Sequence, residues 1–186
     1  DDVQMGCGRT GPFFSFEEAG IKPDIVCLSK SISGYGIPMA LTLIRPELDV
    51  WEPGEHNGTF RGISPAFVTA AEALNLFWRT DELEKSTKAK GERIGTALTE
   101  IAEAYPQAGL VAKGSGLARG IEMGEGDQGG DLASKVCREA FQRGMLMETS
   151  GPEGEVVKLL PPLTVSDAEV DQGLEILRAS VDAVLG

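Results

Sequence analysis

The sequence has 186 residues, a length that suits one or two domains, and its 41% of hydrophobic residues is enough for a folded core. Its 17 basic and 29 acidic residues give a net charge of −12, which argues against a nucleic-acid-binding face or an anionic membrane surface, because both need clustered lysine and arginine. No apolar run approaches the roughly 20 residues of a membrane span.

The first third of the chain has the pattern of an α/β domain, in which short apolar strands are joined by loops rich in glycine. Residues 25–28 (IVCL) form a continuous apolar run, which predicts a strand buried on both faces, and residues 38–44 predict a second strand. Residues 33–36 predict a glycine loop between them. Residues 51–62 contain a Pro-Gly and an Asn-Gly pair and predict a longer loop.

The rest of the chain alternates amphipathic helices with short strands. One helix is predicted to begin at Ser64, as N-cap, with Pro65 in its first turn, and a long helix covers residues 81–105. Two later helices are predicted at 132–143 and, from a capping box at 166–169 (SDAE), to about 185. The remaining predictions are strands at 117–123, 145–147 and 156–160 and a glycine-rich turn at 124–130.

Near residue 80 the composition changes from strands and glycine loops to charged amphipathic helices. We therefore predict a domain boundary at about residues 80–86, with residues 1–82 in one domain and 83–186 in another. The chain begins without a methionine and opens directly on a polar motif, so we expect it to be the C-terminal portion of a longer protein.

The cysteine and histidine residues argue against several kinds of site. Cys7, Cys27 and Cys137 contain no CxxC pair, which disfavours a disulfide scaffold or a zinc knuckle. His56 is the only histidine, and we expect no metal site. The first ten residues lack the features of a signal peptide, and a cytoplasmic location fits best.

Residues 6–11 (GCGRTG) spell the GxGxxG fingerprint of dinucleotide-binding folds. That fingerprint needs a preceding strand and a following helix, and Pro12 with the turn at 20–23 leaves little room for a helix. We therefore favour a glycine turn that lets the backbone pass close to another group, with nicotinamide or flavin binding as the alternative.

Lys30 follows the apolar run at 25–28 and precedes the glycine loop, which places an amine at the carboxyl end of a strand, where α/β folds build their sites. A lysine amine that is desolvated and unprotonated can form an imine with an aldehyde. On spacing alone, an ordinary surface lysine at a strand end is the more common interpretation.

Four other positions have a functional and a structural interpretation. The carboxylate of Asp1 could keep a heteroaromatic nitrogen protonated and the amide of Gln4 could donate to a phenolate oxygen, or both are simply solvated. In residues 56–62 (HNGTFRG), Thr59 could contact a phosphate and Arg61 could bind a carboxylate, or the segment is a surface turn with a structural ion pair.

Lys158 is the single cation in the apolar run at 156–163 (VVKLLPPL). A lone charge in such a run is costly to bury unless it is paired. It therefore meets either an anionic substrate or a neighbouring acidic residue.

Taken together, residues 1–11 (DDVQMGCGRTG), 28–38 (LSKSISGYGIP) and Gly58-Thr59 resemble the class III pyridoxal-phosphate aminotransferases. The resemblance is specific to about residue 80 and looser beyond it, where it rests on 116–123 (GLARGIEM) and 158–163 (KLLPPL). Within the class, residues 13–36 and 51–62 are most similar to the transaminases of ectoine synthesis that use diaminobutyrate and 2-oxoglutarate, with ornithine and 4-aminobutyrate enzymes as the alternative.

The resemblance implies fold type I, with the chain supplying the C-terminal part of a large, mainly parallel-sheet α/β domain (1–82) and a small α+β C-terminal domain (83–186). It implies that Lys30 holds pyridoxal 5'-phosphate as an imine and moves a proton during catalysis. Asp1 would pair with the ring nitrogen, Gln4 would contact the ring's phenolic oxygen, and Thr59 would reach the cofactor phosphate of a partner subunit in a homodimer or higher homo-oligomer.

The expected reaction moves an amino group from glutamate to aspartate semialdehyde, so the partners are small amino acids and 2-oxo acids. Many relatives have Asp-Glu where this chain has Asp1-Asp2, and many have an arginine that grips the substrate carboxylate where this chain has Lys158. Lysine lacks the bidentate fork of arginine, so either Lys158 or Arg61 would bind that carboxylate. We expect the chain alone to be inactive.

Overall fold

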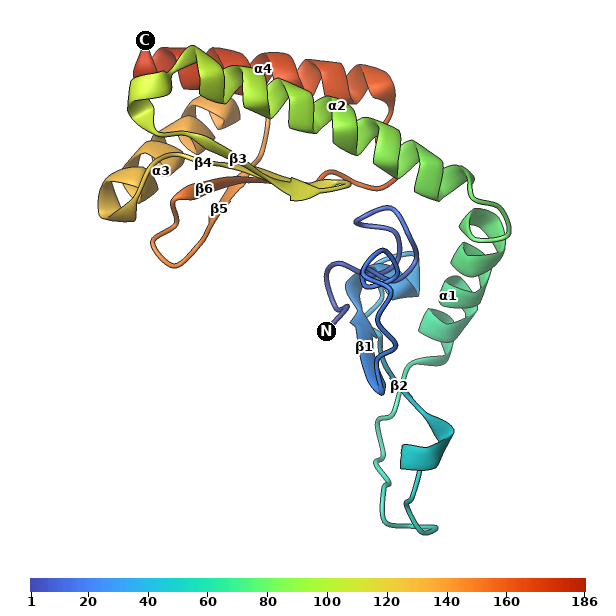
Figure 1. Ribbon diagram of the computed structural model, residues 1–186. Helices are drawn as coiled ribbons and strands as arrows, with labels where there is room; N and C mark the ends of the chain where they lie inside the picture. Colours follow the sequence, from blue (N-terminus) through green and yellow to red (C-terminus); the bar gives the residue numbers. More distant parts are fainter. The chain divides into compact units, whose positions relative to one another are not determined.

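The computed structural model describes the backbone of residues 1–186 and all side chains except those of residues 126 and 127. The chain forms two compact units, Asp1–Ser86 and Thr87–Gly186, whose elements are labelled in Figure 1. Each unit has its own buried cluster. None of the helices built from the described residues combines the length and apolar content needed to cross a bilayer.

The first unit begins with turns and bends over residues 3–20, followed by strand β1 (Ile25–Ser29), the short 3-10 helix η1 (Lys30–Ser33) and strand β2 (Ala40–Ile44). A second 3-10 turn, η2 (Pro46–Leu48), leads into the loop before helix α1 (Ser64–Phe77). The two strands pair antiparallel, with Ile25 opposite Ile44 and Ser29 opposite Ala40.

The small core of this unit gathers around Leu28. Cys7, Leu28 and Ile32 are buried together, and Phe13, Phe14, Val26, Met39 and Leu41 pack against them. The prediction that β1 is buried on both faces is wrong for this chain: Leu28 is its one fully buried residue among those described, and Ile25 is 52% exposed. Burial on both faces requires cover on both faces, and the strand pairings here give β1 a single neighbour, β2.

The second unit is an antiparallel sheet with helices packed on one face. Its strands are β3 (Val111–Ser115), β4 (Ala118–Glu122), β5 (Glu148–Ser150) and β6 (Val156–Leu159), in the order β3-β4-β6-β5. Its helices are α2 (Glu82–Ala104), which starts within the first unit, α3 (Gly126–Gln142) and α4 (Asp167–Leu185), and the 3-10 turn η3 (Pro106–Ala108) follows α2.

The core of this unit lies between the sheet and the three helices. Alternate residues of β6, Val157 and Leu159, are buried against it, as period-2 side-chain alternation requires. Helices α2 and α4 lie side by side (Figure 1) and are linked by an ion pair between Glu100 and Arg178 at 2.9 Å. All strand pairings that the structure describes are antiparallel, so the parallel strands of the expected large sheet are not among them.

Two predictions about helix starts have opposite outcomes. The capping box at the start of α4 is confirmed: the Ser166 hydroxyl accepts from the Glu169 amide, and the Glu169 carboxylate accepts from the Ser166 amide. The prediction of Ser64 as N-cap is wrong, since Ser64 is the first residue of α1 and Ile63 precedes it without a side-chain cap.

The predicted glycine turn at 124–130 is also wrong in part, because α3 already begins at Gly126. Its glycines serve packing: a Cβ atom at Gly129 would overlap the carbonyl of Gly124, and one at Gly130 would overlap the carbonyl oxygen of Glu153. The predicted strand at 145–147 is a loop, and strand β3 was not predicted.

Candidate functional site

Lys30 lies where β1 ends, as the first residue of η1. Its backbone is in the left-handed region, with φ of 53°, a conformation that costs a residue other than glycine about 1–2 kcal/mol. The side chain is exposed, so this chain by itself does not supply the desolvated surroundings that an unprotonated amine needs. Strained backbone of this kind is often found at functional sites.

The backbone around Lys30 is fixed on both sides. The Ser29 hydroxyl donates to the Met39 carbonyl at 2.8 Å, which ties the end of β1 to the residue that precedes β2. On the other side, η1 packs against α1 so closely that a Cβ atom at Gly34 would overlap the Cβ of Ala73 and lie 3.0 Å from the Thr69 carbonyl oxygen. These contacts hold Lys30 in its unfavourable conformation.

Asp1 and Gln4 belong to the N-terminal segment, which lies against β1. The Asp2 amide donates to the Cys27 carbonyl at 2.9 Å, and Cys27 is three residues before Lys30. Asp1 and Gln4 are both exposed, and the Asp1 carboxylate accepts a local hydrogen bond from the Val3 amide at 2.9 Å. The structure thus brings this segment together with β1, the strand that ends immediately before Lys30.

Asp2 was not singled out in the sequence. It is 2% exposed, and its two carboxylate oxygens accept hydrogen bonds from the amide and the hydroxyl of Ser15. Cys7, a member of the buried cluster around Leu28, has a thiol whose pKa is raised to about 11 by burial and, to a lesser extent, by the negative charge of Asp2. That thiol stays protonated at neutral pH and is unsuited to act as a nucleophile.

Residues 6–11, which spell the dinucleotide fingerprint, form turns with no preceding strand and no following helix in the described backbone. A Cβ atom at Gly6 would lie 2.7 Å from the Asp2 carbonyl oxygen and 2.9 Å from Leu28 Cδ2. The glycine therefore allows a close approach of the N-terminal segment to β1, as the favoured interpretation of this motif holds.

Thr59 and Arg61 lie in the loop between η2 and α1. This loop leaves the β1–β2 hairpin at the end opposite Lys30, because Ile44 pairs with Ile25. Thr59 is exposed, and the guanidinium of Arg61 donates to the His56 carbonyl within the same loop. The structure of this chain does not bring either residue to Lys30.

Lys158 belongs to the second unit, on the sheet face opposite the buried residues of β6. Its Nζ lies 2.9 Å from Oε2 of Glu148, which is directly across from it on β5, and its side chain is 28% exposed. The sequence left open whether Lys158 meets a substrate or a neighbouring acid, and in this chain it pairs with Glu148. The hydrogen bond and charge of Lys158 lower the pKa of Glu148.

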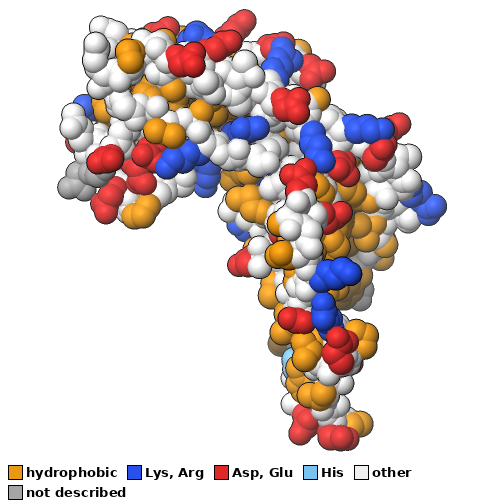
Figure 2. Space-filling view, viewed as in Figure 1, with side chains coloured by type: hydrophobic (Ala, Val, Ile, Leu, Met, Phe, Trp, Pro, Cys, Tyr) orange, Lys and Arg blue, Asp and Glu red, His pale blue; other side chains and the backbone are white. Residues whose placement is uncertain are grey.

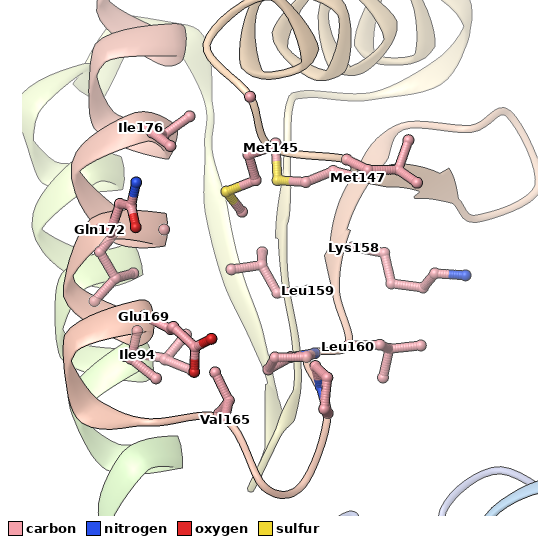
Figure 3. Close-up of a pocket in the computed structure, with 17 residues that line it drawn as sticks. Ile94, Met145, Met147, Lys158, Leu159, Leu160, Val165, Glu169, Gln172 and Ile176 are labelled. Carbon is pink, nitrogen blue, oxygen red and sulfur yellow. The ribbon is translucent and has the colours of Figure 1, made fainter. Parts of the chain in front are cut away.

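A cavity of about 530 Å³ opens beside β6 in the same unit (Figure 3). Its walls are mainly apolar and include Met145, Met147, Leu159 and Ile176. Lys158 is among the lining residues, and Figure 3 shows its amine directed away from Leu159. In the described part of the chain no cluster of three or more metal-ligating side chains is found.

Comparisons with known proteins cover nearly the whole chain. The sequence profile of the family described as aminotransferase class-III matches residues 1–181. The chain is 62% identical over 184 residues to a diaminobutyrate–2-oxoglutarate transaminase of Nocardia farcinica, which covers 99% of this chain and 41% of the relative. It is 54% identical over 185 residues to the enzyme of the same name from Sporosarcina pasteurii, covering 100% of this chain and 43% of the relative.

Solved structures give a similar result. The ornithine aminotransferase of Toxoplasma gondii ME49 aligns with a TM-score of 0.87 and 26% identity, over 99% of this chain and 42% of that chain. The ornithine δ-aminotransferase of Plasmodium falciparum aligns with a TM-score of 0.82 and 27% identity. The chain therefore spans about two fifths of the length of the curated relatives and of the Toxoplasma structure that it matches.

Proposed function

Because the chain belongs to the class-III aminotransferase family, we propose that it is part of a pyridoxal-phosphate enzyme that moves an amino group from glutamate to aspartate semialdehyde. The products are 2-oxoglutarate and diaminobutyrate, so one amine becomes a ketone and one aldehyde becomes an amine. The observation that carries the proposal is the amine of Lys30, which stands on left-handed backbone immediately after β1. The acidic N-terminal segment is hydrogen-bonded to the same strand through the Asp2 amide and the Cys27 carbonyl.

The residues present fit the cofactor by their donor chemistry. Lys30 offers an exposed amine for the aldehyde, Asp1 a carboxylate for the ring nitrogen, and Gln4 an amide for the phenolic oxygen. When bound, pyridoxal phosphate supplies an aldehyde that captures amines reversibly and a ring that accepts electrons.

The residues of this chain would then perform three tasks. Lys30 would hold the cofactor in the resting enzyme and would donate or accept the proton at the substrate carbon that bears nitrogen. The Asp1 carboxylate stabilises a positive charge on the ring nitrogen. Lys158 or Arg61 binds the substrate carboxylate, and each would first exchange its present partner, Glu148 or the His56 carbonyl, for that group.

We further propose that residues 1–82 belong to a large cofactor-binding domain and residues 83–186 to a small C-terminal domain, and that two copies form a homodimer. The loop that carries Thr59 also exposes apolar side chains: Val50 and Trp51 are exposed, and Phe60 is 98% exposed. Figure 2 shows hydrophobic side chains gathered over the first unit. Thr59 would reach the cofactor phosphate of the partner subunit.

The free thiols of Cys7, Cys27 and Cys137 support a cytoplasmic location.

The test uses the full-length protein with a Lys30→Ala variant and, as a matched control, Lys22→Ala, which removes another exposed lysine of the same unit. The wild type and Lys22→Ala should show the visible absorbance band of pyridoxal phosphate attached to a lysine, and Lys30→Ala should lack both the band and amino transfer. Retention of the band in Lys30→Ala would refute the proposal.

The substrate is tested by comparing kcat/KM for diaminobutyrate, ornithine and 4-aminobutyrate, each with 2-oxoglutarate as amino acceptor. We expect diaminobutyrate to be preferred, in line with the 62% identity to the Nocardia enzyme against 26% for the Toxoplasma ornithine aminotransferase. A preference for ornithine or 4-aminobutyrate would assign the chain to that alternative.

A further inference from the structure

Asp2 is the one buried carboxylate among the side chains that the structure describes. Burying a carboxylate is costly unless hydrogen-bond donors replace the water that it loses. Both donors come from Ser15: its amide reaches Oδ2 at 3.0 Å, and its hydroxyl reaches Oδ1. The side chain of Asp2 therefore fastens the N-terminal segment to the loop that carries Ser15.

The backbone of Asp2 fastens the same segment to β1. Its amide donates to the Cys27 carbonyl at 2.9 Å, and its carbonyl accepts from the Gly6 amide at 3.1 Å. The turn closed in this way rests on Leu28, two residues before Lys30. Asp2 thus connects three parts of the first unit: the N-terminal turn, the loop around Ser15, and strand β1, which ends immediately before Lys30.

Among the described side chains, neither Asp1 nor Gln4 has a comparable anchorage of its own. Both are exposed, and the hydrogen bond of the Asp1 carboxylate to the Val3 amide stays within the turn. Asp2 lies between them in sequence and is both buried and hydrogen-bonded, so it sets the place of these two side chains relative to Lys30.

We propose that Asp2, held by Ser15, is a positioning residue: it sets where Asp1 and Gln4 stand relative to Lys30 when the cofactor is bound. The inference rests on the proposed function, since it assumes that these three side chains contact pyridoxal phosphate. Asp2 acts through its hydrogen-bond geometry. An asparagine can reproduce that geometry, because its oxygen accepts from the Ser15 amide and its NH2 group donates to the Ser15 hydroxyl.

The test uses four variants of the full-length protein. Ser15→Ala removes one donor, Asp2→Ala removes both acceptors, and Asp2→Asn keeps two hydrogen bonds without the charge. Glu17→Ala is the matched control, because Glu17 accepts from the Phe14 amide at 2.7 Å in the same loop, whereas the hydrogen bonds described for the Asp2 carboxylate come from Ser15. The measurements are the affinity of the apoprotein for pyridoxal phosphate and the pH midpoint of the bound cofactor's visible absorbance.

Ser15→Ala should weaken cofactor affinity about 3- to 10-fold and shift the pH midpoint, because loss of one hydrogen bond to a buried charged group is felt on this scale. Asp2→Ala should weaken it further, while Asp2→Asn and Glu17→Ala should stay within about twofold of the wild type. If Asp2→Ala does not fold, Ser15→Ala decides the question.

If the wild type shows the band and Ser15→Ala has the same cofactor affinity and the same pH midpoint as the wild type, this inference is overturned and the proposed function is not. A Glu17→Ala variant as impaired as Ser15→Ala would also overturn it, because the effect would then be one of loop stability. Absence of a Lys30-dependent band in the wild type would instead overturn the proposed function.

Discussion

Glu148 and Lys158 face each other across strands β5 and β6, with Oε2 of the carboxylate 2.9 Å from Nζ of the ammonium group. The pair lies on the sheet face away from the helices, and the carboxylate is largely exposed. Lys158, one of our two candidates for binding the substrate carboxylate, is thus already paired with an acidic residue of the same sheet.

Replacement of Lys158 by methionine should return the pKa of Glu148 to its ordinary range, since the hydrogen bond and charge of Lys158 lower it in the native protein. A carboxylate whose pKa is lowered on folding stabilises the fold above its unfolded pKa, and the contribution is lost as the pH falls through the folded pKa. The wild type should therefore lose this contribution in the acid range below the ordinary glutamate pKa, and Lys158→Met should not.

The measurement is an NMR titration of the Glu148 carboxyl carbon in both proteins. Glu169 serves as an internal reference, because its pKa is lowered chiefly by the Ser166 amide and should not respond to Lys158→Met. An unshifted Glu148 in the wild type would contradict the ion pair.

Two glycines inside helices should respond to alanine in opposite directions. At Gly130 in α3 a Cβ atom would overlap the Glu153 carbonyl oxygen, so Gly130→Ala should destabilise the protein by about 1–3 kcal/mol. At Gly173 in α4 it would meet Met145 Sδ at 3.7 Å, an ordinary contact, so Gly173→Ala should stabilise it by about 0.5–1 kcal/mol.

Denaturant unfolding of the two variants and the wild type measures both effects. Each glycine is the control for the other, since both substitutions add one methyl group to a helix. An equal loss of stability in Gly173→Ala and Gly130→Ala would contradict this explanation, which ascribes the loss at Gly130 to the close Glu153 carbonyl oxygen.

Cys7 should resist alkylation in the folded protein. With a pKa of about 11, only about one thiol in a thousand is ionised at pH 8, and burial adds a steric barrier. Mass spectrometry after iodoacetamide treatment should find Cys7 unmodified in native protein and modified in denaturant. Rapid modification under native conditions would contradict the buried packing of Cys7 against Leu28 and Ile32.

The parts of the fold that were predicted correctly are those set by neighbours in sequence. The capping box at Ser166 and Glu169 needs only four residues, and the strands near Ile25 and Val156 needed only a local apolar run. Gly129 and Gly130 show where this fails: local chemistry favours a turn, whereas close backbone contact with residues 124 and 153 keeps them in a helix.

The candidate site divides in the same way. The place of Lys30 at a strand end follows from local pattern, while its left-handed backbone depends on packing of η1 against α1. The bonding of Asp2 to Ser15 joins residues 13 apart, and the pairing of Lys158 with Glu148 depends on strand register. The residues next to Asp2 do not indicate Ser15 as its partner, and the residues next to Lys158 do not indicate Glu148.

The left-handed backbone at position 30 bears on how this position can evolve. Glycine is the residue that such a conformation favours, so exchange of the lysine for glycine would relieve the backbone while discarding the reactive nitrogen. A lineage released from selection for the reaction would gain stability by that one exchange. A homologous chain with glycine here would therefore mark a descendant that has abandoned the chemistry and kept the scaffold.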